Sequence, residues 1–137
     1  SDLTGIMYVS VDKGKRLEPG MSIQLAPNGA DTSQTGSLLG VVRSVSDYPV
    51  DQASMVRNLG NAQLAQTILQ QVQNSVVEVR FDLVKNENDA SGYLWTSIVG
   101  EHKLVTAGTY VTGSVIIDRK APIEKVFYKA SQWLRNR

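Results

Sequence analysis

The feature that most constrains the fold is a stretch from Tyr110 to Ile117, in which β-branched side chains dominate and residue types alternate. Successive side chains of a strand point to opposite faces, and β-branched side chains pack well on such a half-buried surface. Ala107 and Gly108 precede the stretch, and glycine turns the chain at positive φ without steric cost. The sequence therefore predicts a long strand that follows a structural turn, with Gly108 at positive φ.

Shorter segments with a similar pattern occur earlier in the chain, at residues 5–11, 21–26, 38–45, 76–84 and 93–98. A sheet made of many short strands has exposed edges unless it closes on itself, and closure into a barrel removes those edges. We therefore expect a mainly β fold. Its core is a small antiparallel β-barrel, with a helical insertion at about residues 51–73 and a C-terminal helix.

Two of these predicted strands differ in how their faces are covered. Both faces of residues 5–11 are largely apolar, which is typical of a strand that is covered on each side. In residues 76–84, apolar side chains alternate with Glu78, Arg80 and Asp82. The alternating signs of these charges favour a solvated face over a catalytic role.

Glycine and proline mark the turns between these segments. Pro19 and Gly20 occupy the two central positions of a predicted type II turn, which requires positive φ at the second of them. Gly40 interrupts the segment 38–45 and suggests a β-bulge or a sharp bend at a barrel corner.

The period of the apolar residues changes between residues 51 and 73. Asp51 is suited to cap a short helix that ends near Asn58, and Asn61 is suited to cap a second one. The second helix has an apolar stripe, and its opposite face consists of glutamines. No charged residue occurs from Asn58 to Val77. This face is either a plain polar surface or one that a partner covers, because neutral amides lose water more easily than charges. The candidate partner contacts are Gln63, Gln66 and Gln70.

The end of the chain, from Pro122 to Arg137, has apolar residues at helical spacing and is otherwise basic. Most terminal helices of this kind dock on their own domain, and a minority bind a membrane surface or a partner. Lys125, Lys129 and Arg135 are the candidate contacts if this helix binds a partner.

Composition excludes several classes of function. A chain of 137 residues fits a single domain, and its net charge of +1 gives no argument for nucleic-acid binding. There is no cysteine, and His102, the only histidine, lies in a polar turn without a cluster of possible metal ligands. We find no nucleophile motif, phosphate loop or dinucleotide fingerprint. We therefore expect no catalytic, cofactor or metal site, and no enzyme activity.

The order of the segments resembles the C-terminal part of HlyD-type membrane fusion proteins, which are periplasmic adaptors. Tyr8-Val9 followed by Lys15 to Met21 is similar to that family's strand, exposed turn and Pro-Gly-Met step. Residues 39–46 resemble its next strand, and residues 104–127 resemble its C-terminal signature. The similarity is greater to adaptors of bacteriocin-type peptide export systems. It rests there on the turn Tyr48-Pro49, the step Leu59-Gly60-Asn61 and the segment 92–97.

This resemblance implies a non-catalytic adaptor domain, part of a longer membrane-anchored protein on the extracytoplasmic, periplasmic side of the bacterial inner membrane. Its partners would be an inner-membrane ABC transporter, neighbouring copies of the adaptor and, through domains outside this sequence, an outer-membrane channel. The absence of cysteine fits such a compartment. The alternative is a small-ligand-binding β-barrel, which a buried apolar cavity with convergent polar groups would favour.

Overall fold

The computed structural model describes the backbone of residues 4–27, 36–72, 75–89, 91–96, 110–117 and 121–131. Side chains are described for residues 4–25, 36–72, 75–89 and 91–96. The strands within these ranges are β1 (Thr4–Ser10), β2 (Ser22–Pro27), β3 (Leu38–Val45), β4 (Val76–Leu83), β5 (Tyr110–Ile117) and β6 (Ala121–Ser131). The helices are α1 (Val11–Gly14), α3 (Gln52–Leu59) and α4 (Ala62–Gln71).

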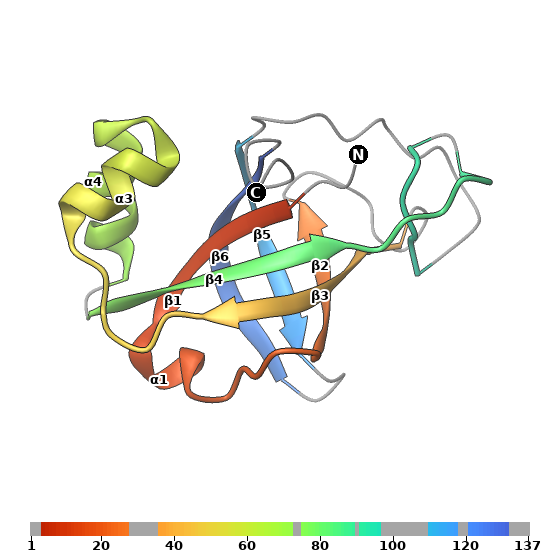
Figure 1. Cartoon of the computed structure of the whole chain (residues 1–137), viewed down its shortest axis with the longest axis horizontal. Helices are drawn as coiled ribbons and strands as arrows, with labels where there is room; N and C mark the ends of the chain where they lie inside the picture. Colours follow the sequence, from red (N-terminus) through yellow and green to blue (C-terminus); the bar gives the residue numbers. More distant parts are fainter. Residues whose placement is uncertain are drawn as a thin grey trace.

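The strands form one antiparallel sheet in the order β1-β4-β3-β2-β5-β6. Four neighbouring strands, β1, β4, β3 and β2, make a curved half-barrel, and β5 and β6 complete the ring by pairing with β2 and β1 (Figure 1). The register places Met7 opposite Val79 and Ile23 opposite Gly40. The expected antiparallel, mainly β architecture is confirmed.

An apolar cluster fills the described part of the barrel interior. Inward-facing residues of β1 to β4 pack against Leu17 and Tyr93, and half-buried Trp95 borders them. The members from these strands are Met7, Val9, Ile23, Leu25, Leu38, Val42, Val77, Val79, Phe81 and Leu83. Burial of such side chains is the main force that closes a barrel of this size.

A second apolar cluster lies outside the barrel, where α3 and α4 cover the outer face of β1 and the start of β4 (Figure 1). Ile6, Tyr8 and Val76 of the strands pack there against side chains from the two helices. The helical members are Met55, Leu59, Ala65 and Ile68. Strand β1 is therefore buried on both faces, as its two apolar faces predict.

The predicted type II turn at Pro19-Gly20 is confirmed. Gly20 has φ 94°, and the backbone N–H of Met21 donates to the carbonyl of Glu18 over 3.1 Å. The other predicted structural turn, at Gly108, lies outside the described residues.

The bulge that was expected at Gly40 lies further along β3. The pairing with β4 shifts between Val42 and Ser44, so Arg43 is the extra residue. Gly40 has a different role, because a Cβ at this position would lie 3.3 Å from the carbonyl oxygen of Asp82 and from Cγ1 of Ile23. The absence of a side chain there relieves a tight approach of the neighbouring strands.

The C-terminal segment differs from the prediction. Residues 121–131 form strand β6, where we expected a helix that starts at Pro122. β6 pairs with β5 on one side and with β1 on the other, as in Tyr110↔Lys129 and Ile6↔Lys129. The apolar residues have helical spacing, but strand pairing prevails. The two hydrogen-bond ladders satisfy backbone N–H and C=O groups of β1, β5 and β6.

The predicted strand at residues 93–98 is also different in the structure. Tyr93 and Trp95 form isolated bridges with Lys85 and Leu38, and residues 97 and 98 lie outside the described ranges. Within the ranges given above, no helix is long and apolar enough to cross a lipid bilayer.

Candidate functional site

A buried carboxylate with several polar contacts lies where the helices meet the barrel. Tyr8 of β1 and Glu78 of β4 are directly opposite each other in the antiparallel pairing. Both side chains point out of the barrel, because the inward positions of β4 are those of Val77, Val79 and Phe81. The covering helix α3 leaves Tyr8 1% and Glu78 8% exposed.

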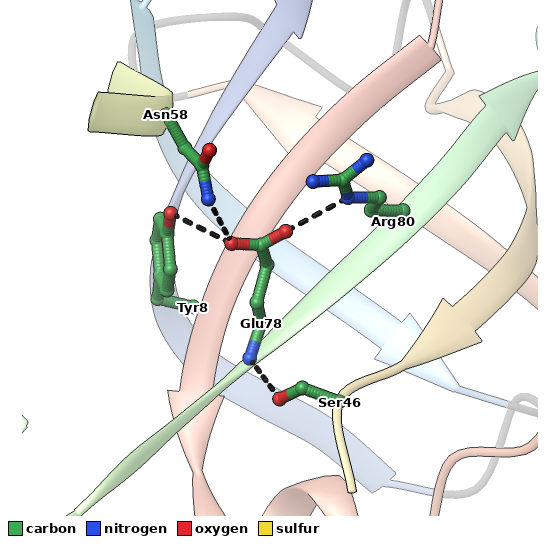
Figure 2. A network of polar contacts seen from close by, with 5 residues as sticks. All are labelled: Tyr8, Ser46, Asn58, Glu78 and Arg80. Carbon is green, nitrogen blue, oxygen red and sulfur yellow. Dashed lines mark hydrogen bonds and ion pairs between the residues drawn. The ribbon is translucent and has the colours of Figure 1, made fainter. Parts of the chain in front are cut away.

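The Glu78 carboxylate joins three side chains (Figure 2). Its Oε2 accepts hydrogen bonds from the Tyr8 hydroxyl over 3.2 Å and from Nδ2 of Asn58 over 2.6 Å. Its Oε1 accepts one from Nε of Arg80 over 2.8 Å, which is also an ion pair. Both carboxylate oxygens therefore have partners.

The backbone of Glu78 extends these contacts to the segment that follows β3. Its N–H donates to Oγ of Ser46 over 2.9 Å (Figure 2), and its carbonyl accepts from the N–H of Ser46 over 2.9 Å. One residue thus connects β1, β4, α3 and the connection from β3 to α3. We call Tyr8, Ser46, Asn58, Glu78 and Arg80 the Glu78 network.

The electrostatics of the Glu78 network favour a fixed arrangement of its side chains. Arg80 supplies the positive charge that offsets the cost of burying the carboxylate. Removal of one partner of a buried ion pair costs on the order of 3–5 kcal/mol, because the remaining charge is left unpaired. Burial, and then the nearby Glu78 charge, raise the pKa of Tyr8 well above its ordinary value. Tyr8 is therefore a neutral hydrogen-bond donor, and the network positions α3 on the barrel.

The two helices are defined by local capping. Oδ1 of Asp51 accepts from the N–H of Ser54 over 2.8 Å, and Oδ1 of Asn61 accepts from the N–H of Leu64 over 3.0 Å. Gly60 ends α3 in the left-handed conformation, with φ 69°. The backbone N–H of Ser54 also lowers the pKa of the Asp51 carboxyl, so this cap stays ionised at neutral pH.

Helix α4 has two distinct faces. Ala65 and Ile68 are fully buried in the outer cluster, whereas the candidate contacts Gln63, Gln66 and Gln70 are all exposed. The helix is therefore part of the outer core through its apolar stripe and part of the surface through its glutamines. The exposed amides form what we call the glutamine face: Gln63, Gln66, Gln70 and Gln71.

Two of the predicted basic contacts lie on a strand and not on a helix. Lys125 and Lys129 belong to strand β6, and their side chains lie outside the described part of the structure. Arg135 and His102 also lie outside it. The role of these basic residues in partner binding stays a prediction.

Sequence reasoning missed the Glu78 network. The alternation of Glu78, Arg80 and Asp82 predicted one solvated face, and this is correct only for its far end. The Asp82 side chain is 41% exposed and pairs loosely with Arg43 at 3.6 Å. Glu78 is buried because α3 and α4 cover the start of β4. The signal for this burial in the sequence was the apolar outward face of β1. Another element must cover that face, and the covering element then also lies beside Glu78.

No group of three or more possible metal-ligating side chains gathers within the described ranges. None of the protein-family models, curated proteins or solved structures with which the chain was compared matches it.

Proposed function

We propose that this chain is a non-catalytic adaptor domain of an HlyD-type membrane fusion protein, which couples an inner-membrane ABC exporter to the secretion of a peptide or protein cargo. In this proposal the barrel is the family's C-terminal β-barrel, and α3 and α4 are its helical insertion between β3 and β4. The full-length protein would be anchored at the extracytoplasmic side of the membrane, beside neighbouring copies of itself.

The observation that carries the proposal is the glutamine face of α4. A solvated helix normally carries lysine and glutamate, but no charge occurs from Asn58 to Val77. Gln66 and Gln70 are exposed, so their amides are available to a partner and cost less to dehydrate than charged groups. The opposite face of α4 is fixed in the outer cluster, so the partner would meet a preorganised surface.

The Glu78 network supports the same role. Asn58 bonds to a carboxylate that is itself held by β1 and β4, so rotation of α3 on the barrel would break a part-buried hydrogen bond. A domain that contacts both a transporter and neighbouring subunits in a defined geometry needs its helices to be attached rigidly to its barrel.

The ligand-binding alternative has less support. The described inward side chains of β1 to β4 pack against one another in a single apolar cluster, which includes Met7, Phe81 and Tyr93. That packing provides no specific observation in favour of a ligand chamber.

The test replaces two exposed glutamines of α4 by acids, Gln66→Glu with Gln70→Glu, in the full-length protein. We expect the free energy of unfolding to change by less than about 1 kcal/mol, because both side chains are exposed. Export of the cargo should fall, because the new charges must be dehydrated when the transporter or a neighbouring copy binds.

A matched control adds the same two charges elsewhere, as Ser22→Glu with Asn88→Glu. Both control residues are exposed and lie outside α3 and α4. The control should export normally. Normal export by the α4 double variant would contradict a partner-binding role for the glutamine face.

A further inference from the structure

Among the described residues, Tyr48 is the one large apolar side chain that is mostly in solvent, with 80% of its surface exposed. It lies in the short connection between β3 and α3, between Asp47 and Pro49, which are also exposed. Single exposed apolar residues are common on protein surfaces, so exposure alone does not indicate a binding site. The argument rests on how the backbone around Tyr48 is held.

The connection is fixed to β4 on both sides of Tyr48. The N–H of Ser46 donates to the carbonyl of Glu78, and the N–H of Val50 donates to the carbonyl of Val76, each over 2.9 Å. Residues 47–49 are thus exposed and lie between two backbone hydrogen bonds. Pro49 fixes its own φ and restricts the residue before it to extended conformations. Tyr48 is therefore held out in solvent on a stiff support.

The charges nearest to Tyr48 along the chain are negative. From Ser44 to Val56 the charged residues are Asp47 and Asp51, both exposed, and the next charges on either side are those of Arg43 and Arg57. Asp51 caps α3, and the backbone N–H of Ser54 lowers its pKa, so its negative charge persists at neutral pH. A partner that covers Tyr48 must accept two carboxylates at the rim of the contact. Complementary charges at a rim steer association and reject partners of the same sign.

We propose that Tyr48 is an anchor residue that inserts into an apolar socket of the transporter, and that lysine or arginine side chains rim this socket. The inference rests on the proposed adaptor function and names a second contact besides the glutamine face. Tyrosine is enriched among the residues that dominate binding energy, because a large, stiff side chain loses little conformational freedom on binding. The fixed backbone of residues 46–50 lowers that cost further.

The experiment measures how much transporter co-purifies with the full-length adaptor from detergent-solubilised membranes of cells that produce both. Tyr48→Ala should lower the recovered transporter by about tenfold or more, as truncation of an anchor residue does. Tyr48→Phe keeps the ring and should lose much less. Asp47→Lys should also reduce recovery, and this loss should be smaller at high salt, where charge repulsion is screened.

Folding is controlled separately. Because the Tyr48 side chain is largely exposed, the midpoint of thermal unfolding of Tyr48→Ala should match that of the wild type. Asn88→Ala, an exposed position in the loop after β4, is the matched surface control and should leave recovery unchanged.

The outcomes separate this inference from the proposed function. Full recovery of the transporter with Tyr48→Ala overturns the anchor. If the α4 variant Gln66→Glu with Gln70→Glu still loses recovery in the same preparation, the adaptor function stands and only the anchor fails. If the wild-type protein brings down no transporter at all, both the adaptor function and the anchor are wrong.

Discussion

At the scale of single residues, Gly5 and Phe81 show how tightly the barrel interior is filled. They are partners in the β1–β4 register, and a Cβ built on Gly5 would lie 2.0 Å from Cζ of the Phe81 ring. The Phe81 side chain is 1% exposed and belongs to the inner cluster, so the ring has no free space to move into. The aromatic ring therefore requires a glycine opposite it.

We predict that Gly5→Ala destabilises the protein by on the order of 1–3 kcal/mol, as overpacking of a filled core does. Chemical denaturation with the isolated chain measures this loss. Phe81→Leu in the same background should recover part of it, because the smaller side chain makes room for the new methyl group. The explanation fails if Gly5→Ala has wild-type stability, or if the two substitutions simply add.

Tyr8 gives a prediction on pH. Its ordinary pKa is 10.0, and burial next to Glu78 raises the pKa in the folded state. Above the ordinary value the unfolded chain releases this proton while the folded protein keeps it, so stability falls as pH rises toward the folded pKa. Below that value the contribution is fully present. We expect the free energy of unfolding to fall by up to about 1.4 kcal/mol per pH unit in this range because of Tyr8 alone.

The comparison with Tyr8→Phe isolates this effect. The variant loses the hydrogen bond to Glu78 and is less stable at neutral pH, but it lacks the group that titrates. The two stability curves should therefore converge as the pH rises above about 10, the ordinary value for tyrosine. Parallel curves would show that Tyr8 does not resist ionisation in the folded state.

At the scale of elements, Asn58 provides a polar link between α3 and the barrel through the Glu78 carboxylate. Asn58→Asp places a second carboxylate where an amide now donates over 2.6 Å, so both repulsion and a lost hydrogen bond oppose docking. We expect hydrogen exchange to accelerate in α3 and α4 while the amides of β2 and β3 keep their protection.

The control for that prediction is Arg57→Ala. Arg57 is the neighbouring residue, is exposed, and bonds only locally, from Nη2 to Oγ of Ser54 over 2.9 Å. Its removal should change stability by about 0.5 kcal/mol or less. Equal acceleration of exchange in the helices and in the barrel strands after Asn58→Asp would mean that the helix pair does not open as a separate unit.

The elements also show what the sequence can and cannot predict. The pattern of residues 5–11, apolar on both faces, predicts correctly that β1 is covered twice, and Pro19-Gly20 predicts its turn type. Such features depend on local chemistry. The burial of Glu78 depends on which strand the helices cover, and alternation within 76–84 carries no information about that. The segment 121–131 is a strand because two partner strands are available, although its own spacing fits a helix.

At the scale of the whole molecule, β1 and β4 connect the two apolar clusters. Met7 and Val79 face the barrel interior, whereas Ile6 and Val76 face the helices. The pairing of β6 with β1 completes the ring from the other side. A strand with cores on both faces cannot shift its register without exposing one of them, so this arrangement fixes the position of Glu78 and of the connection that bears Tyr48.

The pairing of β6 with β5 can be tested because the chain has no cysteine of its own. Tyr110 and Lys129 are direct partners in the β5–β6 register. Opposite residues of antiparallel strands have Cα atoms about 4.5–5.5 Å apart, which lies within the range that a disulfide spans. We therefore predict that Tyr110→Cys with Lys129→Cys forms an intramolecular disulfide under mild oxidation, visible as faster migration in non-reducing electrophoresis.

Tyr110→Cys with Tyr128→Cys is the matched control, because adjacent residues of a strand point to opposite faces. If residues 122–137 formed a helix instead, no register would favour position 129 over position 128. Equal or greater crosslinking of the control pair would contradict the register in which β6 pairs with β5.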